Sequence, residues 1–172
     1  MNDLVELAEQ SIDASEDLQD SSSLAEQYLS FTLGDETFAV EILSVQEIRT
    51  WEVPTLLPRA PEYMKGVINL RGAIVPVIDL RLKFGICEPE YNDTTVVIVL
   101  RIVEQKKVRI MGIVVDSMSD VLFIDKDKIR NSPEFGGKVD ADYIEGLTTV
   151  DGNIVSLLTT DTLLSIEQIS HA

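Results

Sequence analysis

The sequence predicts a mostly β protein made of two similar small β-barrels that share one hydrophobic core. Three observations predict it: near-continuous β-branched runs in mid-chain, turn residues at short intervals between apolar segments, and an internal repeat. The 172 residues are 45% hydrophobic, enough for one substantial core or two small ones. Because a half of about 60–75 residues would bury too little apolar surface alone, we expect the halves to pack on a shared seam with a groove between them.

The first 27 residues differ from the rest in composition. They hold eight acidic residues, and no Lys or Arg precedes Tyr28, so half of the net charge of −16 lies in this segment. Few apolar positions interrupt the acidic and serine residues, and we expect residues 1–27 to form a flexible acidic tail. The other half of the negative charge leaves no basic surface for phosphate backbones, so nucleic acid is not an expected partner.

A hairpin is expected to open the folded region at residues 28–41. Apolar and polar residues alternate along QYLSFTL, Gly34-Asp35 supplies turn chemistry, and ETFAVE continues the pattern with a buried face. A loop rich in proline follows and leads into a helical turn at residues 61–65. The prolines of this loop are Pro54, Pro58 and Pro61.

The segment KGVINLRGAIVPVIDLR is expected to form the next hairpin. Its two apolar runs flank a corner that Asn69, Arg71 and Gly72 mark. The turn needs the asparagine and the glycine, but it does not need an arginine. At this point Arg71 is either an ordinary solvated turn residue or a group that meets a partner.

Two more hairpins and a helix complete the expected elements. TTVVIVLRIVEQKKVRIMGIVV predicts strands at 96–103 and 108–115, and its β-branched runs suit strands that are covered on both faces. YIEGLTTVDGNIVSLL contains Asp151-Gly152, which is typical of a two-residue hairpin turn. A short helix at 161–168 is expected to close the chain.

The repeat appears when the sequence is aligned with itself. A first alignment matches positions 63–75 with 143–155, and a second matches positions 40–48 with 113–121. Two matches in the same order indicate an internal duplication. A pseudo-twofold relation would then bring residues 45–48 and 118–121 to opposite walls of one cleft.

The duplication predicts an N-terminal barrel over residues 28–88 and a C-terminal barrel over residues 93–160. Exchange of strands between the two barrels stays open at this point.

No residue pattern predicts catalysis, a metal site or a cofactor. His171 is the only histidine and Cys87 the only cysteine, which excludes a histidine-based catalytic triad and a thiolate metal cluster. Residues 125–127 start like a calcium loop and residues 136–138 end like a phosphate loop, but neither motif is complete. We expect a binding protein; the competing hypothesis, a small-ligand or enzyme domain of barrel type, requires a polar pocket with paired titratable groups.

A cytoplasmic location is expected from the absence of two signals. The chain has no apolar run of about 18 residues that could span a bilayer. Its acidic N-terminus also lacks the basic and apolar regions of a secretory signal.

Several segments together resemble the chemotaxis coupling proteins of the CheW family. They run from about Tyr28 to Gln168 and include FTLGDETFAVEI, SVQEIR, KGVINLRGAIVPVIDLR, YNDTTVVIVL and GIVVDSMSDV. The resemblance implies two five-stranded SH3-like β-barrels on a joint core, with short helices in the connections and at the C-terminus. It also implies a non-enzymatic adaptor in the cytoplasm, recruited to membrane-associated receptor arrays.

The same resemblance implies the partners and a site. The partners would be the cytoplasmic tip of chemoreceptors and the regulatory domain of the histidine kinase CheA, with other adaptor copies in array rings as a further candidate. An adaptor for another chemosensory pathway, such as pilus-based motility, is the alternative. The receptor-binding groove would lie between the barrels. Its matching positions in this chain are Val45, Glu47, Ile48, Arg71, Val96, Gly112 and Met118.

The chemistry of these seven positions suits a helical hairpin as ligand. Four of them would supply an apolar floor, and the charges of Glu47 and Arg71 would fix the register. With the resemblance, we interpret Arg71 as a recognition group steadied by Glu47 and not as a solvated turn residue. Gly112 would let backbone approach closely. Two features depart from the family pattern: the segment 102–109 is a few residues longer, and the N-terminal tail is unusually acidic.

Overall fold

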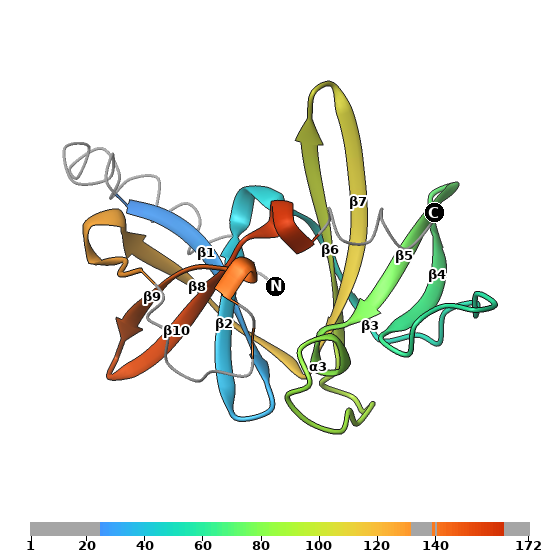
Figure 1. Ribbon diagram of the computed structural model, residues 1–172, viewed down its shortest axis with the longest axis horizontal. Helices are drawn as coiled ribbons and strands as arrows, with labels where there is room; N and C mark the ends of the chain where they lie inside the picture. The colour runs from blue at the N-terminus through green and yellow to red at the C-terminus, as the bar shows by residue number, and fades with distance from the viewer. Residues whose placement is uncertain (1–24, 132–138, 140, 164–172) are drawn as a thin grey trace, which may run out of the picture.

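The computed structural model describes residues 25–131, 139 and 141–163, and these residues form two five-stranded β-sheets (Figure 1). The first sheet has the order β8-β1-β2-β10-β9, and the second has the order β3-β6-β7-β5-β4. The strands of the first sheet are β1 (Ala25–Leu33), β2 (Glu36–Glu41), β8 (Ser117–Asp125), β9 (Ile144–Val150) and β10 (Asn153–Leu158). Those of the second are β3 (Val45–Thr50), β4 (Met64–Leu70), β5 (Ala73–Asp79), β6 (Val96–Glu104) and β7 (Lys107–Val115). The predicted mostly β fold with two similar subdomains is confirmed.

Helical segments are short and lie in the connections. They are η1 (Ile42–Ser44), α3 (Leu80–Lys83), η2 (Lys126–Lys128) and η3 (Ala141–Tyr143). Residues 160–163 are also helical, whereas the rest of the expected closing helix at 161–168 lies outside the described residues. The predicted helical turn at 61–65 contains one turn hydrogen bond, from the Met64 amide to the Pro61 carbonyl at 3.0 Å, and β4 begins at its end.

Each sheet closes on itself through a short bridge after its edge strand. Thr55, downstream of β3, pairs with Val67 in β4, and Arg130, downstream of β8, pairs with Leu147 in β9. Both bridges carry two backbone hydrogen bonds of 2.8–2.9 Å. We therefore call the closed first sheet the first barrel and the closed second sheet the second barrel.

The barrels are not the contiguous halves 28–88 and 93–160, and that prediction is wrong. The chain leaves the first barrel after β2, builds all five strands of the second barrel, and returns to the first barrel at β8. The cause is four pairings between strands far apart in sequence. Two are parallel, β2 with β10 and β5 with β7, and two are antiparallel, β1 with β8 and β3 with β6. Strand exchange, left open by the sequence, is therefore the arrangement of the molecule.

The folded region begins earlier than the expected end of the tail at residue 27. Strand β1 begins at Ala25, where it pairs with Asp125 of β8, so residues 25–27 belong to the first barrel and not to a tail. Residues 1–24, on which the expectation of a flexible acidic tail rests, lie outside the described residues.

The internal repeat is visible in the strands and in their pairing. Strands β4 and β9 begin at matched positions of the first alignment and also end at matched positions, and β5 and β10 begin at matched positions as well. The parallel pair Val77 and Gly112 in the second barrel corresponds to Leu157 and Ala39 in the first. Both sequence alignments thus describe one structural duplication.

A shared core joins the barrels, and each barrel also has an interior of its own. The shared core takes side chains from both sheets, including Phe31 and Phe38 from the first and Ile98 and Leu100 from the second. The interior of the second barrel is almost entirely valine and leucine, and that of the first surrounds Tyr28. The two barrels are therefore held by a common apolar layer, and its margins are the natural place to seek a site.

Candidate functional site

The edge strands β3 and β8 hold equivalent positions at the margins of the shared core. Strand β3 pairs with β6, and β8 pairs with β1, while β6 and β1 both send side chains into that core. Residues directly opposite each other in neighbouring strands share a face of the sheet. The outer residues of β3 and β8 therefore continue the face of the shared core to its edge.

Three residues of each edge strand lie on this face, and we name them the β3 stripe and the β8 stripe. The β3 stripe is Val45, Ile48 and Thr50, opposite Leu100, Ile98 and Val96. The β8 stripe is Met118, Val121 and Phe123, opposite Phe31, Leu29 and Gln27. Both pairings carry an irregularity at the equivalent place, which keeps residues three apart on one face.

The two stripes are apolar and only partly covered, except that the exposed Thr50 of the β3 stripe is polar. Val45 packs against the shared core, whereas Ile48, Met118 and Val121 are 40–45% exposed and Phe123 is 65% exposed. A large apolar side chain with that exposure marks a surface for a partner when its neighbours are apolar too. The sequence analysis selected Val45, Ile48 and Met118 but missed Phe123, which the second alignment, continued along both strands, matches with the polar Thr50.

Arg71 and Glu47 form an ion pair next to the β3 stripe. The Arg71 Nη2 atom lies 3.1 Å from the Glu47 Oε2 atom, which confirms that the glutamate steadies the arginine. The arginine side chain is nevertheless 79% exposed, while that of Glu47 is 21% exposed and also lies 3.6 Å from Arg49. Most donors of Arg71 therefore face solvent.

The turn itself does not require Arg71. Arg71 and Gly72 have φ angles of 53° and 90°, and the Gly72 amide donates to the Asn69 side chain at 2.8 Å. This left-handed conformation suits glycine or asparagine and is uncommon for an arginine. The backbone therefore gains nothing from the side chain, and the interpretation of Arg71 as a recognition group stays a prediction.

The last two predicted residues lie deeper than expected. Val96 is half-buried against the shared core. Gly112 is buried in β7, where an added Cβ atom would lie 2.8 Å from Val97 Cγ1 and 3.4 Å from Val77 Cγ2. The expected role of Gly112 in close approach of a partner backbone is not met, because its free space is filled by the interior of the second barrel.

Three hollows on the described surface have volumes of about 190, 390 and 330 Å³, and none of these three is lined by any of the seven predicted positions. The smallest of them lies next to the predicted positions, since Thr50 of the β3 stripe and Asn69 of the Arg71 corner line it. The candidate site is therefore described by its two equivalent margins and one ion pair.

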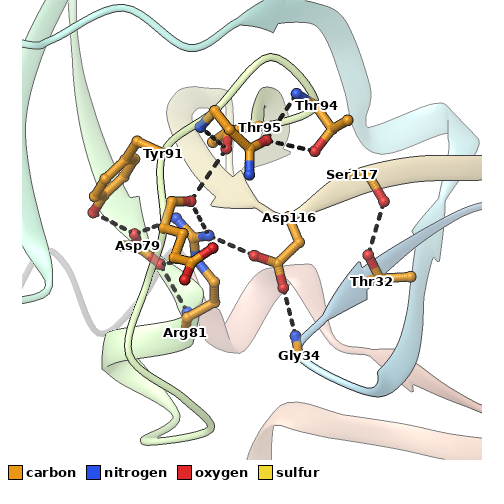
Figure 2. A network of polar contacts seen from close by, with 11 residues as sticks. Thr32, Gly34, Asp79, Arg81, Tyr91, Thr94, Thr95, Asp116 and Ser117 are labelled. Atoms are coloured by element: carbon orange, nitrogen blue, oxygen red, sulfur yellow. Dashed lines mark hydrogen bonds and ion pairs between the residues drawn. The ribbon is translucent and has the colours of Figure 1, made fainter.

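A buried polar network is the feature that the sequence analysis missed (Figure 2). Arg81 is fully buried and makes a two-pronged ion pair with the equally buried Asp79, with N–O distances of 2.9 and 2.8 Å. Asp116 accepts a further bond from Arg81 at 2.5 Å, and the Tyr91 hydroxyl donates to Asp79 at 2.7 Å. The segment VIDLRLKF contained a signal for it, since Asp79 and Arg81 lie there among apolar residues. Asp and Arg are rarely fully buried unless they are paired.

The network shifts two pKa values. Burial alone would lower the pKa of Arg81, but the hydrogen bonds and charges of Asp79 and Asp116 raise it above its ordinary value. Burial and the bond to Asp79 raise the pKa of Tyr91. Arg81 therefore stays charged and Tyr91 neutral throughout the physiological pH range.

A second group of charges lines the 390 Å³ hollow between η1 and the ends of β6, β9 and β10. Glu41, Glu145 and Asp161 face this hollow, and Lys126 lies 2.6 Å from the adjacent Glu26. Burial, and then the negative charge of Glu26, raise the pKa of Glu41, while burial and the charge of Glu41 raise the pKa of Glu145. The ionised carboxylates of Glu26, Glu41 and Glu145 therefore repel one another at neutral pH.

Glu41→Gln is expected to stabilise the protein at pH 7. The folded-state pKa of Glu41 lies above the unfolded value of about 4.3, so the folded state binds more protons there and loses stability as pH rises through the raised pKa. Because Glu41 is partly exposed, solvent screens much of this repulsion, and removal of the charge should gain only about 0.5 kcal/mol, or about 1–2 °C in melting temperature, at pH 7. The gain should vanish below the unfolded pKa, near pH 4 or lower.

Thermal unfolding at pH 7 and pH 4 measures this difference. Glu36→Gln, the same change at the exposed start of the same strand, serves as the control. A destabilised Glu41→Gln at pH 7 would contradict the proposed repulsion.

Two further kinds of site are absent from the part of the chain that the structure describes. No group of three or more His, Cys, Asp or Glu side chains is placed there to hold a metal ion. Among the same residues, no helix has the length and hydrophobicity needed to cross a membrane.

Comparison with known proteins identifies the family. The model of the CheW-like domain matches residues 27–168. The chemotaxis protein CheW of Klebsiella aerogenes is 41% identical over 148 residues, covering 86% of this chain and 87% of that protein. The probable chemotaxis protein CheW of Rhizobium etli is 34% identical, covering 81% of this chain and 87% of that protein.

A solved structure gives the same answer for the fold. The crystal structure of the scaffolding protein TtCheW from Thermoanaerobacter tengcongensis matches with a TM-score of 0.71 and 29% identity, over 78% of this chain and 84% of that one. Family model, sequence relatives and fold therefore agree, and the chain belongs to the CheW family of chemotaxis scaffolding adaptors.

Proposed function

We propose that this protein couples chemoreceptors to the histidine kinase CheA, with the receptor tip bound across the β3 and β8 stripes. The observation that carries the proposal is a set of exposed apolar side chains at equivalent margins of one core, with the Glu47–Arg71 ion pair beside the β3 stripe. A helical hairpin presents apolar side chains at regular intervals along one face, which suits two such stripes. An adaptor role in pilus-based motility has no observation in its favour.

The chemistry of the surface assigns a task to each part. Ile48, Met118, Val121 and Phe123 would bury apolar area against the receptor, and Arg71 would set its register through a charged contact. Val96 and Gly112 act beneath the surface, where they shape the sheet that carries the β3 stripe. The adaptor itself is non-enzymatic in this proposal and acts in the cytoplasm at the receptor arrays.

Met118→Asp is expected to weaken binding of a receptor cytoplasmic fragment about 10- to 100-fold, because a carboxylate would replace apolar contact area at the β8 stripe. Binding of the kinase regulatory domain should change much less. Isothermal titration of each partner separately measures both affinities, with circular dichroism to verify the fold.

Ile154→Asp is the matched control, because Ile154 is 66% exposed on β10, outside both stripes. If Met118→Asp and Ile154→Asp bind the receptor fragment equally well, the stripes are not the receptor site. If the unmodified protein binds neither the receptor nor the kinase domain, the coupling role itself fails.

A further inference from the structure

Asp116 is the single residue through which the chain passes from the second barrel back to the first. Strand β7 ends at Val115 and β8 begins at Ser117, and the two strands belong to different sheets. The other crossing, from β2 to β3, runs through the three residues of η1. A one-residue connection between two bodies is a natural hinge unless its conformation is fixed by other contacts.

Two hydrogen bonds attach Asp116 to the first barrel, and a third lies beside them within that barrel. The Asp116 amide donates to the Thr32 carbonyl at 3.0 Å, and the Gly34 amide donates to Asp116 Oδ2 at 2.5 Å. The hydroxyls of Thr32 and Ser117 lie 2.9 Å apart. Thr32 and Gly34 belong to the β1–β2 hairpin, so the carboxylate of Asp116 is tied to that hairpin.

The other carboxylate oxygen of Asp116 is tied to the second barrel. Arg81 Nη1 donates to Asp116 Oδ1 at 2.5 Å and to the Glu90 carbonyl at 2.9 Å. Arg81 has little freedom, since it is fully buried and Asp79 at the end of β5 holds its guanidinium by two bonds. Figure 2 shows Asp116 between Arg81 on one side and Gly34 on the other.

We propose that Asp116 and Arg81 are positioning residues that fix the angle between the barrels, and with it the spacing of the β3 and β8 stripes. The shared core attracts the barrels without a preferred direction. Charge-assisted bonds to a planar, two-pronged guanidinium are directional, and here they act at the crossing itself. The consequence for receptor binding rests on the proposed function, whereas the consequence for barrel geometry does not.

A distance measurement between the barrels tests the proposal without any partner. Spin labels are placed at Ile74 and Ile154, equivalent exposed residues of the second and first barrels, in a Cys87→Ser background. Asp116→Asn keeps the side-chain size but removes the charge. We expect a broadened or shifted distance distribution between these labels, with no change for a pair at Ile74 and Val53 within the second barrel.

Two controls separate positioning from general destabilisation. Asp35→Asn makes the same chemical change in the exposed β1–β2 turn and should leave the distribution unaltered. Tyr91→Phe removes one bond to Asp79 but keeps the contact of Arg81 with Asp116, so it should lower the melting temperature while leaving the distance unchanged. If Asp116→Asn does not fold, Arg81→Lys is measured instead. This change keeps the positive charge but removes the planar, two-pronged guanidinium.

The outcomes are distinct. An unchanged inter-barrel distance in folded Asp116→Asn overturns the proposal. A changed distance together with about a tenfold loss of receptor affinity, equivalent to about 1.4 kcal/mol, supports both the positioning role of Asp116 and Arg81 and the proposed receptor site. A changed distance with unchanged receptor affinity supports the positioning role and contradicts the proposed receptor site.

Discussion

Gly66→Ala is expected to destabilise the protein by about 4 kcal/mol or more, enough to unfold much of the population at 37 °C. Gly66 has a φ angle of +136°, a conformation that side chains rarely adopt. An added Cβ atom would lie 2.1 Å from the Thr55 carbonyl oxygen and 2.7 Å from its carbon. These are backbone atoms of the bridge that closes the second barrel, so the clash cannot be relieved by rotating a side chain.

The duplication supplies graded controls for this prediction. At Gly146, the equivalent position, an added Cβ atom would meet Arg130 O at 2.8 Å and Ile129 Cγ2 at 2.5 Å, without a positive φ. Gly72 has a φ of +90° but nothing within 4 Å, so Gly72→Ala carries backbone strain alone, about 1–2 kcal/mol.

Urea unfolding of the three variants should rank the losses in free energy of unfolding as Gly66, Gly146 and Gly72, from largest to smallest. A Gly66→Ala protein that unfolds at the urea concentration of the parent chain would show that the barrel does not close through Thr55.

Local features of the fold could be predicted from the sequence because their causes are local. The corner at Arg71-Gly72 and its equivalent at Asp151-Gly152 both have left-handed φ angles, 53° and 90° in the first and 50° and 81° in the second. Turn chemistry and alternation within a few residues determine such hairpins. The internal repeat then identified the two hairpins as equivalent.

The assignment of strands to barrels could not be predicted in this way. It depends on pairings between strands that lie far apart in the chain, the parallel pairs β2 with β10 and β5 with β7 and the antiparallel pairs β1 with β8 and β3 with β6. Local periodicity carries no information about such pairings. The repeat itself misled the prediction, because each repeat unit reads as a folding unit when only its sequence is considered. In the molecule, each barrel takes two strands from one repeat and three from the other.

At the candidate site, one contact between side chains could be predicted, whereas the burial of two residues could not. The contact of Arg71 with Glu47 joins a hairpin tip to a neighbouring strand and was correctly expected. Gly112 was misplaced because β7 is covered on both faces, so its sequence does not indicate which residues reach the surface. Arg81 was overlooked, since its burial depends on three segments that meet only in the folded chain.

Arg71→Glu is expected to weaken binding of the receptor cytoplasmic fragment by about 5- to 150-fold, the effect of losing about 1–3 kcal/mol of charged contact. Reversal of the charge would oppose an acidic group of the receptor and would also place a second carboxylate beside Glu47. The fold should change little, because an exposed ion pair contributes about 0–1 kcal/mol to stability. Titration against the receptor fragment and against the kinase regulatory domain, each at two salt concentrations, measures the effect.

Asp151→Lys is the matched control for this change. Asp151 occupies the equivalent turn position in the first barrel, with a φ angle of 50°, so the backbone context is the same and the charge is also reversed. It should leave receptor affinity unchanged.

A double variant, Glu47→Arg with Arg71→Glu, restores an ion pair of opposite polarity at the same place. If the ion pair matters only for the shape of the corner, the double variant should regain receptor binding; if Arg71 itself meets the receptor, binding should remain weak while the melting temperature recovers. Full receptor affinity in a folded Arg71→Glu protein would return Arg71 to the role of a solvated turn residue.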